Sequence, residues 1–278
     1  MSTAFFAQLG SEAHAFDGDV AAVCSHALYA FAGERMIVFH DIAYGILPFG
    51  VAIDGVVDFL SALAPTVEAN LSLTDGAVLC GDRRIGLRTV ARHATAPTYK
   101  LSSPRAARLA EVEDILAERG SKSGVAALFS ANTGGARTHA DALSRAMTNG
   151  DGDSAAEAAT ALLGLGRGLT PSGDDFICGF FSLLLAADKN GIRIPACTKA
   201  VAKRICDRAP TRTSRISAAY VCAALDGKFF SIYDSAAAAL CAEDADTDAL
   251  CDFVLSMGAS SGTDTLCGAL CAAKLITK

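Results

Sequence analysis

The stretch GLGRGLTPSGDD, residues 164–175, runs directly into the apolar segment 176–187 and organises the second half of this chain. Its four glycines predict an irregular loop, because glycine adopts left-handed backbone angles at no steric cost. The apolar segment is shorter than the roughly 20 residues that cross a bilayer, so it predicts a buried helix. The loop therefore lies beside the free N–H groups and the positive dipole end of a helix start.

Helices are predicted on both sides of this loop. From residue 101 onward the sequence is rich in Ala and Leu, and Gly, Pro, Asp, Ser or Thr bound its periodic segments. Such residues start and stop helices. The predicted helices cover about 104–119, 138–148, 154–164, 173–188, 196–208, 214–226, 229–242, 247–257 and 262–276.

The first hundred residues have a different pattern. Short β-branched and aromatic runs with turn residues between them predict strands at 35–40, 50–54, 77–80 and 84–88, and one short helix at 56–63. We therefore predict an α+β chain. Its β-rich N-terminal domain spans residues 1–100, and an all-helical domain, residues 101–278, carries the loop.

Composition excludes several classes of protein. The net charge is -6 and no Lys/Arg-rich run occurs, which disfavours a nucleic-acid or anionic-membrane partner. The N-terminus lacks a basic and apolar signal pattern, so a cytoplasmic protein is expected. The ten cysteines are scattered without C-x-x-C spacing, and we interpret them as small buried residues rather than metal ligands.

The glycine-rich loop is predicted to hold a small anion. Backbone N–H groups near Gly166, Gly168 and Gly173 can turn toward a ligand, and Arg167 can grip the same anion with two hydrogen bonds. No Lys completes a Walker A loop, and Leu169 replaces a glycine of the dinucleotide fingerprint, so a nucleotide is disfavoured. Two hydroxyls complete the predicted site, those of Thr170 and Ser172.

An internal repeat relates this loop to a second one. Residues 172–179 and 261–268 share the pattern S-G-x-D-x-[IL]-C-G, each at the start of an apolar helix. The two starts either face a common site or solve one capping problem independently. As capping boxes, Ser172 would pair with Asp175 and Ser261 with Asp264, which explains these four residues as well as binding does.

Asp174 is less well explained by capping. Three roles remain open for it: binding Mg²⁺ together with Asp175, acting as a general base, or accepting a hydrogen bond from a substrate amide. The segment 211–215, with its hydroxyls and two arginines, is interpreted as a helix N-cap in preference to a second anion contact. The five histidines show no metal-ligand spacing.

These motifs resemble those of the AllH family, a subunit of bacterial oxamate carbamoyltransferase. The resemblance rests on G-x-G-x-G-L-T-P-S-G-D-D-F at 164–176, on G-A-S-S-G-T-D at 258–264, and on the helix start at 214–217. It covers the helical domain well and the N-terminal part loosely. Ala259 departs from the polar residue, often His, expected after Gly258, which puts in doubt an acid–base role there.

The resemblance implies a reaction and partners. Oxalurate and phosphate would be converted to oxamate and carbamoyl phosphate at the end of anaerobic allantoin breakdown, a part of purine catabolism. The chain would be one of three different subunits. Mg²⁺ is the one cofactor that these residues suggest. Under this hypothesis the loop and Arg167 hold phosphate, and Asp174 or Asp175 orients the carbamoyl amide or Mg²⁺. The opposite side of the site is formed by Ser260, Ser261 and Asp264.

Two rival functions remain. The chain is either a non-catalytic subunit that binds an anion or docks a partner, or a Mg²⁺-dependent phosphotransferase or phosphohydrolase with Asp174 and Asp175 as ligands. A plain structural role is disfavoured, because a connection between helices rarely needs so many glycines.

Overall fold

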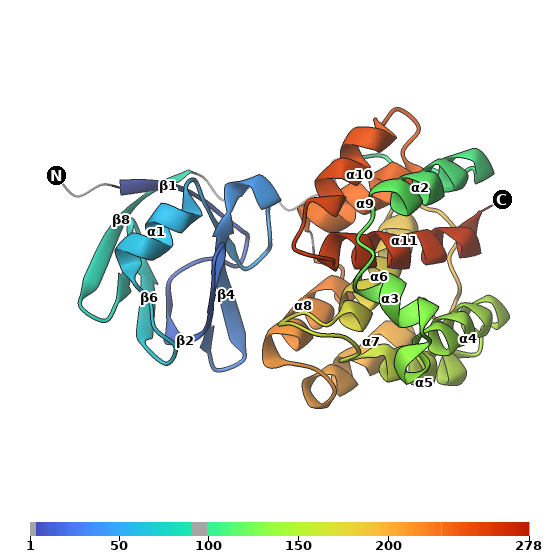
Figure 1. Ribbon diagram of the computed structural model, residues 1–278, viewed down its shortest axis with the longest axis horizontal. Helices are drawn as coiled ribbons and strands as arrows, with labels where there is room; N and C mark the ends of the chain where they lie inside the picture. Colours follow the sequence, from blue (N-terminus) through green and yellow to red (C-terminus); the bar gives the residue numbers. More distant parts are fainter. Residues whose placement is uncertain (1–3, 91–98, 229, 278) are drawn as a thin grey trace. The chain divides into compact units, whose positions relative to one another are not determined.

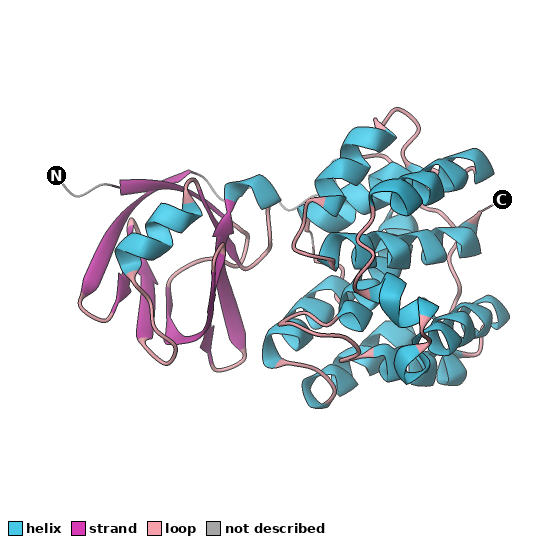
Figure 2. Ribbon diagram, viewed as in Figure 1, coloured by secondary structure: helices cyan, strands magenta, loops and turns pink. Residues whose placement is uncertain are grey.

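The computed structural model describes residues 4–90, 99–228 and 230–277 (Figure 1). The chain divides into two compact units, one within Met1–Ala96 and Phe229–Ser231 and the other within Pro97–Lys228 and Ile232–Lys278. Strands fill the first unit and helices the second (Figure 2), as the α+β prediction requires. The segment just before the predicted domain boundary at residue 100 lies outside the described residues.

The first unit is a closed barrel of eight strands, in the order β1-β5-β4-β3-β2-β6-β7-β8. The β1–β8 and β4–β5 pairs are parallel and the other neighbours are antiparallel. The strands are β1 (Ala4–Leu9), β2 (Phe16–Cys24), β3 (Ala27–Ala32), β4 (Arg35–Asp41), β5 (Gly50–Ile53), β6 (Asn70–Thr74), β7 (Ala77–Cys80) and β8 (Arg83–Val90).

The closed barrel was not predicted from the sequence, and neither were the strands β1, β2, β3 and β6. Closure depends on pairing β1 with β8, whose register joins Ala4 to Gly86 across the whole unit. Local patterns carry no information on such a distant pairing. The predicted short helix is present as α1 (Val56–Leu63), and its Phe59 stacks on Phe39 of β4 with ring centroids 5.6 Å apart inside the barrel core.

The second unit consists of helices. In chain order they are α2 (Ala106–Arg119), α3 (Val125–Ser130), α4 (Ala136–Asn149), α5 (Gly152–Leu162), α6 (Ser172–Lys189), α7 (Thr198–Arg208), α8 (Arg215–Leu225), α9 (Ser231–Cys241), α10 (Thr247–Leu255) and α11 (Ser261–Ile276). Two short 3₁₀ turns of this unit lie at Thr133–Gly135 and Ala209–Thr211, and a third, Ile42–Tyr44, lies in the first unit. All nine helices predicted for this part are present, and α3 was missed.

Helix α6 is the centre of this unit. It is buried along almost its whole length and packs against α11, which lies beside it in Figure 1. The contact is close because both helices carry a glycine at the last position of the internal repeat. A Cβ on Gly179 would lie 2.0 Å from the backbone oxygen of Thr265, and one on Gly268 would lie 2.0 Å from that of Phe176. Since residues 176 and 265 also correspond in the repeat, the two contacts are equivalent.

Among the described residues, no helix is both long and apolar enough to cross a membrane.

Candidate functional site

The predicted capping boxes do not form. Helix α6 begins at Ser172 with Pro171 as its N-cap, and α11 begins at Ser261 with Ser260 as its N-cap; neither helix has a side-chain cap. The two serines are thus the first helical residues, and a side chain there cannot reach back to close the box. Their hydroxyls are available to the opposite helix instead.

Asp174 holds the glycine-rich loop in place. Its Oδ1 accepts a hydrogen bond from the Gly164 N–H at 2.7 Å. Its Oδ2 accepts from the Ser217 hydroxyl at 2.6 Å and from the Thr213 hydroxyl. Burial raises the pKa of Asp174, and these hydrogen bonds oppose the rise. Both oxygens are therefore engaged within the protein, between the loop and the start of α8.

Asp264, on the first turn of α11, is likewise engaged. Its Oδ1 accepts from the Val125 N–H at 2.7 Å and its Oδ2 from the Ser260 hydroxyl at 3.0 Å. Burial raises its pKa, while the hydrogen bonds, including one from Ser172 on α6, lower it. The close approach of the Val125 backbone to Asp264 needs a glycine at position 124, where a Cβ would lie 2.5 Å from the Asp264 Oδ1.

Asp175 differs from both. Only 8% of the residue is exposed, and its Oδ2 is buried without a hydrogen-bond partner among the described residues. Burial raises its pKa well above the ordinary value. Hydrogen bonds from Ser261 and Thr170 lower it, and the nearby charges of Asp264 and Asp174 raise it further. Repulsion by two carboxylates favours a neutral, protonated Asp175.

The two S-G-x-D segments meet through these residues. Ser261 of α11 lies close enough to lower the pKa of Asp175 on α6, and Ser172 of α6 lies close enough to lower the pKa of Asp264 on α11. The Thr170 and Ser261 hydroxyls are 3.3 Å apart. The starts of the two helices therefore converge, and the positive ends of two helix dipoles lie at one place.

The loop itself presents unused backbone donors. Gly166 and Gly168 have φ angles of 119° and 100°, which only glycine adopts readily. The N–H groups of residues 166–170 donate no hydrogen bond to any described residue. Residues 166–169 are exposed, and Arg167 among them forms no ion pair with a described residue. Unpaired N–H groups on an exposed glycine-rich loop are typical of anion sites.

Three residues of this site were missed or undervalued by the sequence analysis: Thr213, Ser217 and Val125. Thr213 lies in the segment interpreted as an N-cap, and that interpretation is confirmed, since Ser214 caps α8 by accepting from the Ser217 N–H at 3.0 Å. No local pattern links this segment to Asp174, because 39 residues separate Thr213 from that carboxylate and only the folded chain brings them together.

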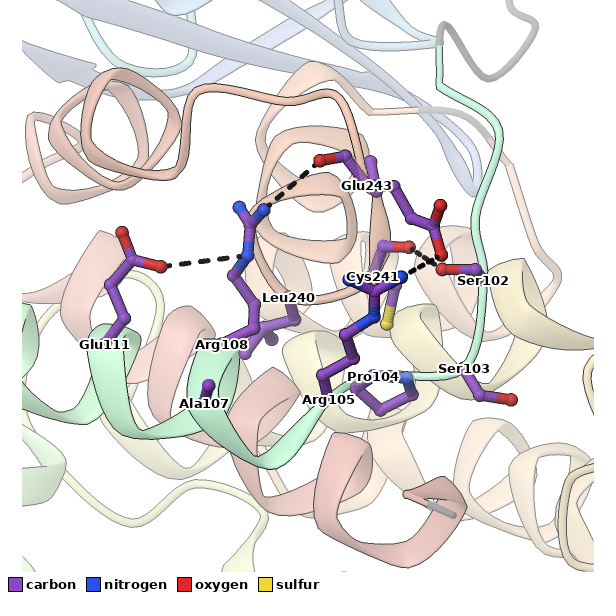
Figure 3. A pocket seen from close by; sticks show the side chains of 11 residues that line it. Ser102, Ser103, Pro104, Arg105, Ala107, Arg108, Glu111, Leu240, Cys241 and Glu243 are labelled. Atoms are coloured by element: carbon purple, nitrogen blue, oxygen red, sulfur yellow. Dashed lines mark hydrogen bonds and ion pairs between the residues drawn. The ribbon is translucent and has the colours of Figure 1, made fainter.

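A pocket of about 200 Å³ lies on other elements, between the start of α2 and the end of α9 (Figure 3). No predicted site residue lines it. Its two arginines are already engaged: Arg105 pairs with Glu243 at 2.8 Å, and the Arg108 Nε lies 3.7 Å from Glu111. The described residues also contain no group of three or more His, Cys, Asp or Glu side chains placed to hold a metal ion.

Comparison with known proteins finds one match, over part of the helical unit. No curated protein and no solved structure matches the chain. The sequence model of one family, described as oxamate carbamoyltransferase subunit AllH, matches residues 162–273. The matched region holds the glycine-rich loop, α6, the α8 start and most of α11. The resemblance predicted from the sequence is thus confirmed, and over these residues the chain is a match to the family of oxamate carbamoyltransferase subunit AllH.

Proposed function

We propose that this chain is the subunit of a carbamoyltransferase that binds a small anion at the glycine-rich loop. The reaction would convert oxalurate and phosphate to oxamate and carbamoyl phosphate, as part of allantoin and purine nitrogen catabolism. The observation that carries the proposal is the row of five unused N–H groups at 166–170, placed where two helix starts converge. Phosphate, carbamoyl phosphate, oxamate and oxalurate are all anions that such a site accepts.

The loop residues have distinct proposed roles. The backbone at Gly166, Gly168 and Gly173 leads the chain around the phosphate, and the exposed Arg167 closes over it with a bidentate grip. The Gly173 N–H itself is used by the Leu165 carbonyl at 2.8 Å, so this glycine serves the close approach to Leu162, whose oxygen would lie 2.0 Å from a Cβ.

The carboxylates divide between structure and substrate. Asp174 and Asp264 are engaged by N–H and O–H donors, so we assign them to holding the loop and the α11 start. The Oδ2 of Asp175 has no hydrogen-bond partner in the part of the chain that the structure describes, and we assign it to the carbamoyl amide of the substrate. Its neutral form also avoids a third negative charge beside the bound anion.

Carbamoyl transfer to phosphate needs no covalent enzyme intermediate. A phosphate oxygen attacks the carbamoyl carbon of oxalurate, and the bond from that carbon to nitrogen breaks. The electron pair stays on the nitrogen, which gains a proton as hydrogen phosphate loses one, and oxamate leaves. Holding both anions in line and stabilising the oxyanion that forms supply the acceleration. Arg167, the loop N–H groups and the Thr170–Ser261 hydroxyls are the donors proposed for this.

The word subunit in the family description supports an assembly with other chains. A subunit implies partner chains, so we propose a hetero-oligomer in the cytoplasm whose other subunits complete the active site. The rival non-catalytic role remains an alternative, because the loop is exposed and would also suit a sensing or docking function. A Mg²⁺-dependent phosphotransferase is a weaker alternative, because three hydrogen bonds already occupy most of the acceptor positions of Asp174.

A calorimetric titration of the purified chain tests the proposal. Phosphate, carbamoyl phosphate, oxamate and oxalurate are each titrated with and without Mg²⁺ into wild type, Arg167→Ala and Arg193→Ala. Arg193 is a matched control, exposed in the same unit and outside the loop. We expect the affinity for the ligand to fall about tenfold or more in Arg167→Ala, because a charged hydrogen bond is lost. The affinity should not change in Arg193→Ala.

Three other outcomes separate the alternatives. Binding of none of the four ligands contradicts an anion site on the isolated chain. Binding that never leads to turnover with the partner subunits present favours the non-catalytic role. Activity that a chelator abolishes favours the Mg²⁺-dependent enzyme.

A further inference from the structure

Two cysteines of neighbouring helices face each other outside the loop. Cys206 lies near the end of α7 and Cys222 near the end of α8. The Cys222 thiol contacts the Cys206 backbone oxygen at 3.6 Å, and the Cys206 thiol contacts the Cys222 backbone oxygen at 4.0 Å. The two side chains therefore lie against each other's backbone. Both side chains are half-buried, so they are neither sealed in the core nor fully open.

The pair is electrostatically asymmetric. The neighbouring Cys206 thiol lowers the pKa of Cys222, and the neighbouring Cys222 thiol raises the pKa of Cys206. In contrast, burial raises the pKa of Cys241 and Cys251 to about 12, which keeps those thiols protonated. A thiolate is the nucleophile in oxidation and disulfide exchange, so Cys222 has the character of an attacking thiol and Cys206 that of its resolving partner.

We propose that Cys206 and Cys222 form a redox-active dithiol that a peroxide oxidises to an intramolecular disulfide. The Cys222 thiolate attacks one peroxide oxygen, the O–O bond breaks, and Cys222 becomes a sulfenic acid as hydroxide leaves and takes a proton. The Cys206 sulfur then attacks the Cys222 sulfur, the S–O bond breaks, and a second water leaves. Two thiols and one hydrogen peroxide thus give one disulfide and two waters.

The position of the pair connects it with the loop. The segment that the disulfide would close carries Thr213 and Ser217, and both donate hydrogen bonds to Asp174. The bond would therefore join the helices on either side of the contact that holds the glycine-rich loop.

Peptide mapping of the full-length chain tests the proposal. The protein is treated with hydrogen peroxide, the remaining thiols are alkylated, and the digest is analysed by mass spectrometry without reduction. We expect one cross-linked peptide pair containing residues 206 and 222, which disappears on reduction. Cys197→Ser is the matched control, because Cys197 is also half-buried beside α7 and contacts Met147 instead. The cross-link should be unchanged in it.

Two variants separate the roles of the pair. Cys206→Ser keeps a hydroxyl donor but no sulfur, so Cys222 should still react and stop at the sulfenic acid, which a sulfenic-acid trapping reagent detects. Cys206→Ala removes the donor, so alkylation of Cys222 should slow several-fold at neutral pH and its pH profile should move upward. Melting curves confirm that each variant is folded. Oxidation elsewhere in the chain with residues 206 and 222 unlinked would overturn the proposal.

Discussion

Asp175 and Asp264 occupy equivalent positions of the internal repeat, yet only Asp264 has both carboxylate oxygens in hydrogen bonds. Its Oδ1 is bonded by Val125 and its Oδ2 by Ser260, whereas the Oδ2 of Asp175 is buried without a partner among the described residues. An unpaired buried acceptor costs stability. A position that departs from its repeat partner in this way is a candidate for contact with a ligand.

Asp175→Asn should stabilise the protein at neutral pH. The folded-state pKa of Asp175 is raised above its ordinary value near 3.8, chiefly by burial. The folded state therefore binds this proton more tightly, and stability falls as pH rises from about 4 toward the folded-state pKa. Asparagine has no such proton to lose. Urea unfolding at several pH values should show a difference in unfolding free energy between variant and wild type that grows as the pH rises above 4. A difference that does not change with pH would argue against a raised pKa of Asp175.

Asp174→Ala should destabilise the helical unit by about 3 kcal/mol. The change removes the acceptor of one N–H and two O–H groups and leaves these donors buried or half-buried without a partner. Asp153→Ala is the control, since 90% of the Asp153 side chain is exposed and its ion pair with Arg204 is worth about 1 kcal/mol or less. Chemical unfolding measures both variants, and equal losses would contradict the role assigned to Asp174.

Gly268→Ala should severely destabilise the chain, by at least about 3 kcal/mol. The added Cβ would lie 2.0 Å from the Phe176 backbone oxygen, so α6 and α11 would have to separate. Gly152→Ala should be neutral or stabilising, because its Cβ would meet Cys197 at 3.4 Å and Val201 at 3.8 Å, both ordinary contacts, and alanine favours a helix. Melting temperatures of the two variants provide the comparison, and similar values would show that the helix contact is loose.

The barrel should lose stability in acid through His40. This side chain is 3% exposed, and burial lowers its pKa from 6.5 to about 4. The unfolded chain binds the proton more tightly between these values, so stability is full above pH 6.5 and falls as the pH drops toward 4, by about 3 kcal/mol in total. His40→Leu should remove this dependence. An unchanged acid transition of the barrel in that variant would contradict the assignment.

The helical unit was largely predictable, because residues that start or stop a helix mark the ends of its helices. Gly, Pro and capping residues bound them, and the apolar segment behind the loop is too long and continuous for a strand. Of the capping details, those at Ser172 and Ser261 were wrong by one residue, because Pro171 and Ser260 take the N-cap position. A shift of the helix start by one residue matters here, because it directs each serine toward the other helix.

The sequence alone identified the loop, the repeat and the resemblance to the AllH family, which the family model matches at residues 162–273, because each is a local pattern of residue types. Closure of the barrel, the convergence of α6 and α11, and the different surroundings of Asp174, Asp175 and Asp264 arise only in the folded chain. Each depends on partners that are distant in sequence: β8 for β1, Thr213 and Ser217 for Asp174, and Ser261 for Asp175. Burial and charge are properties of such assemblies, so the pKa of a carboxylate is set where these segments meet.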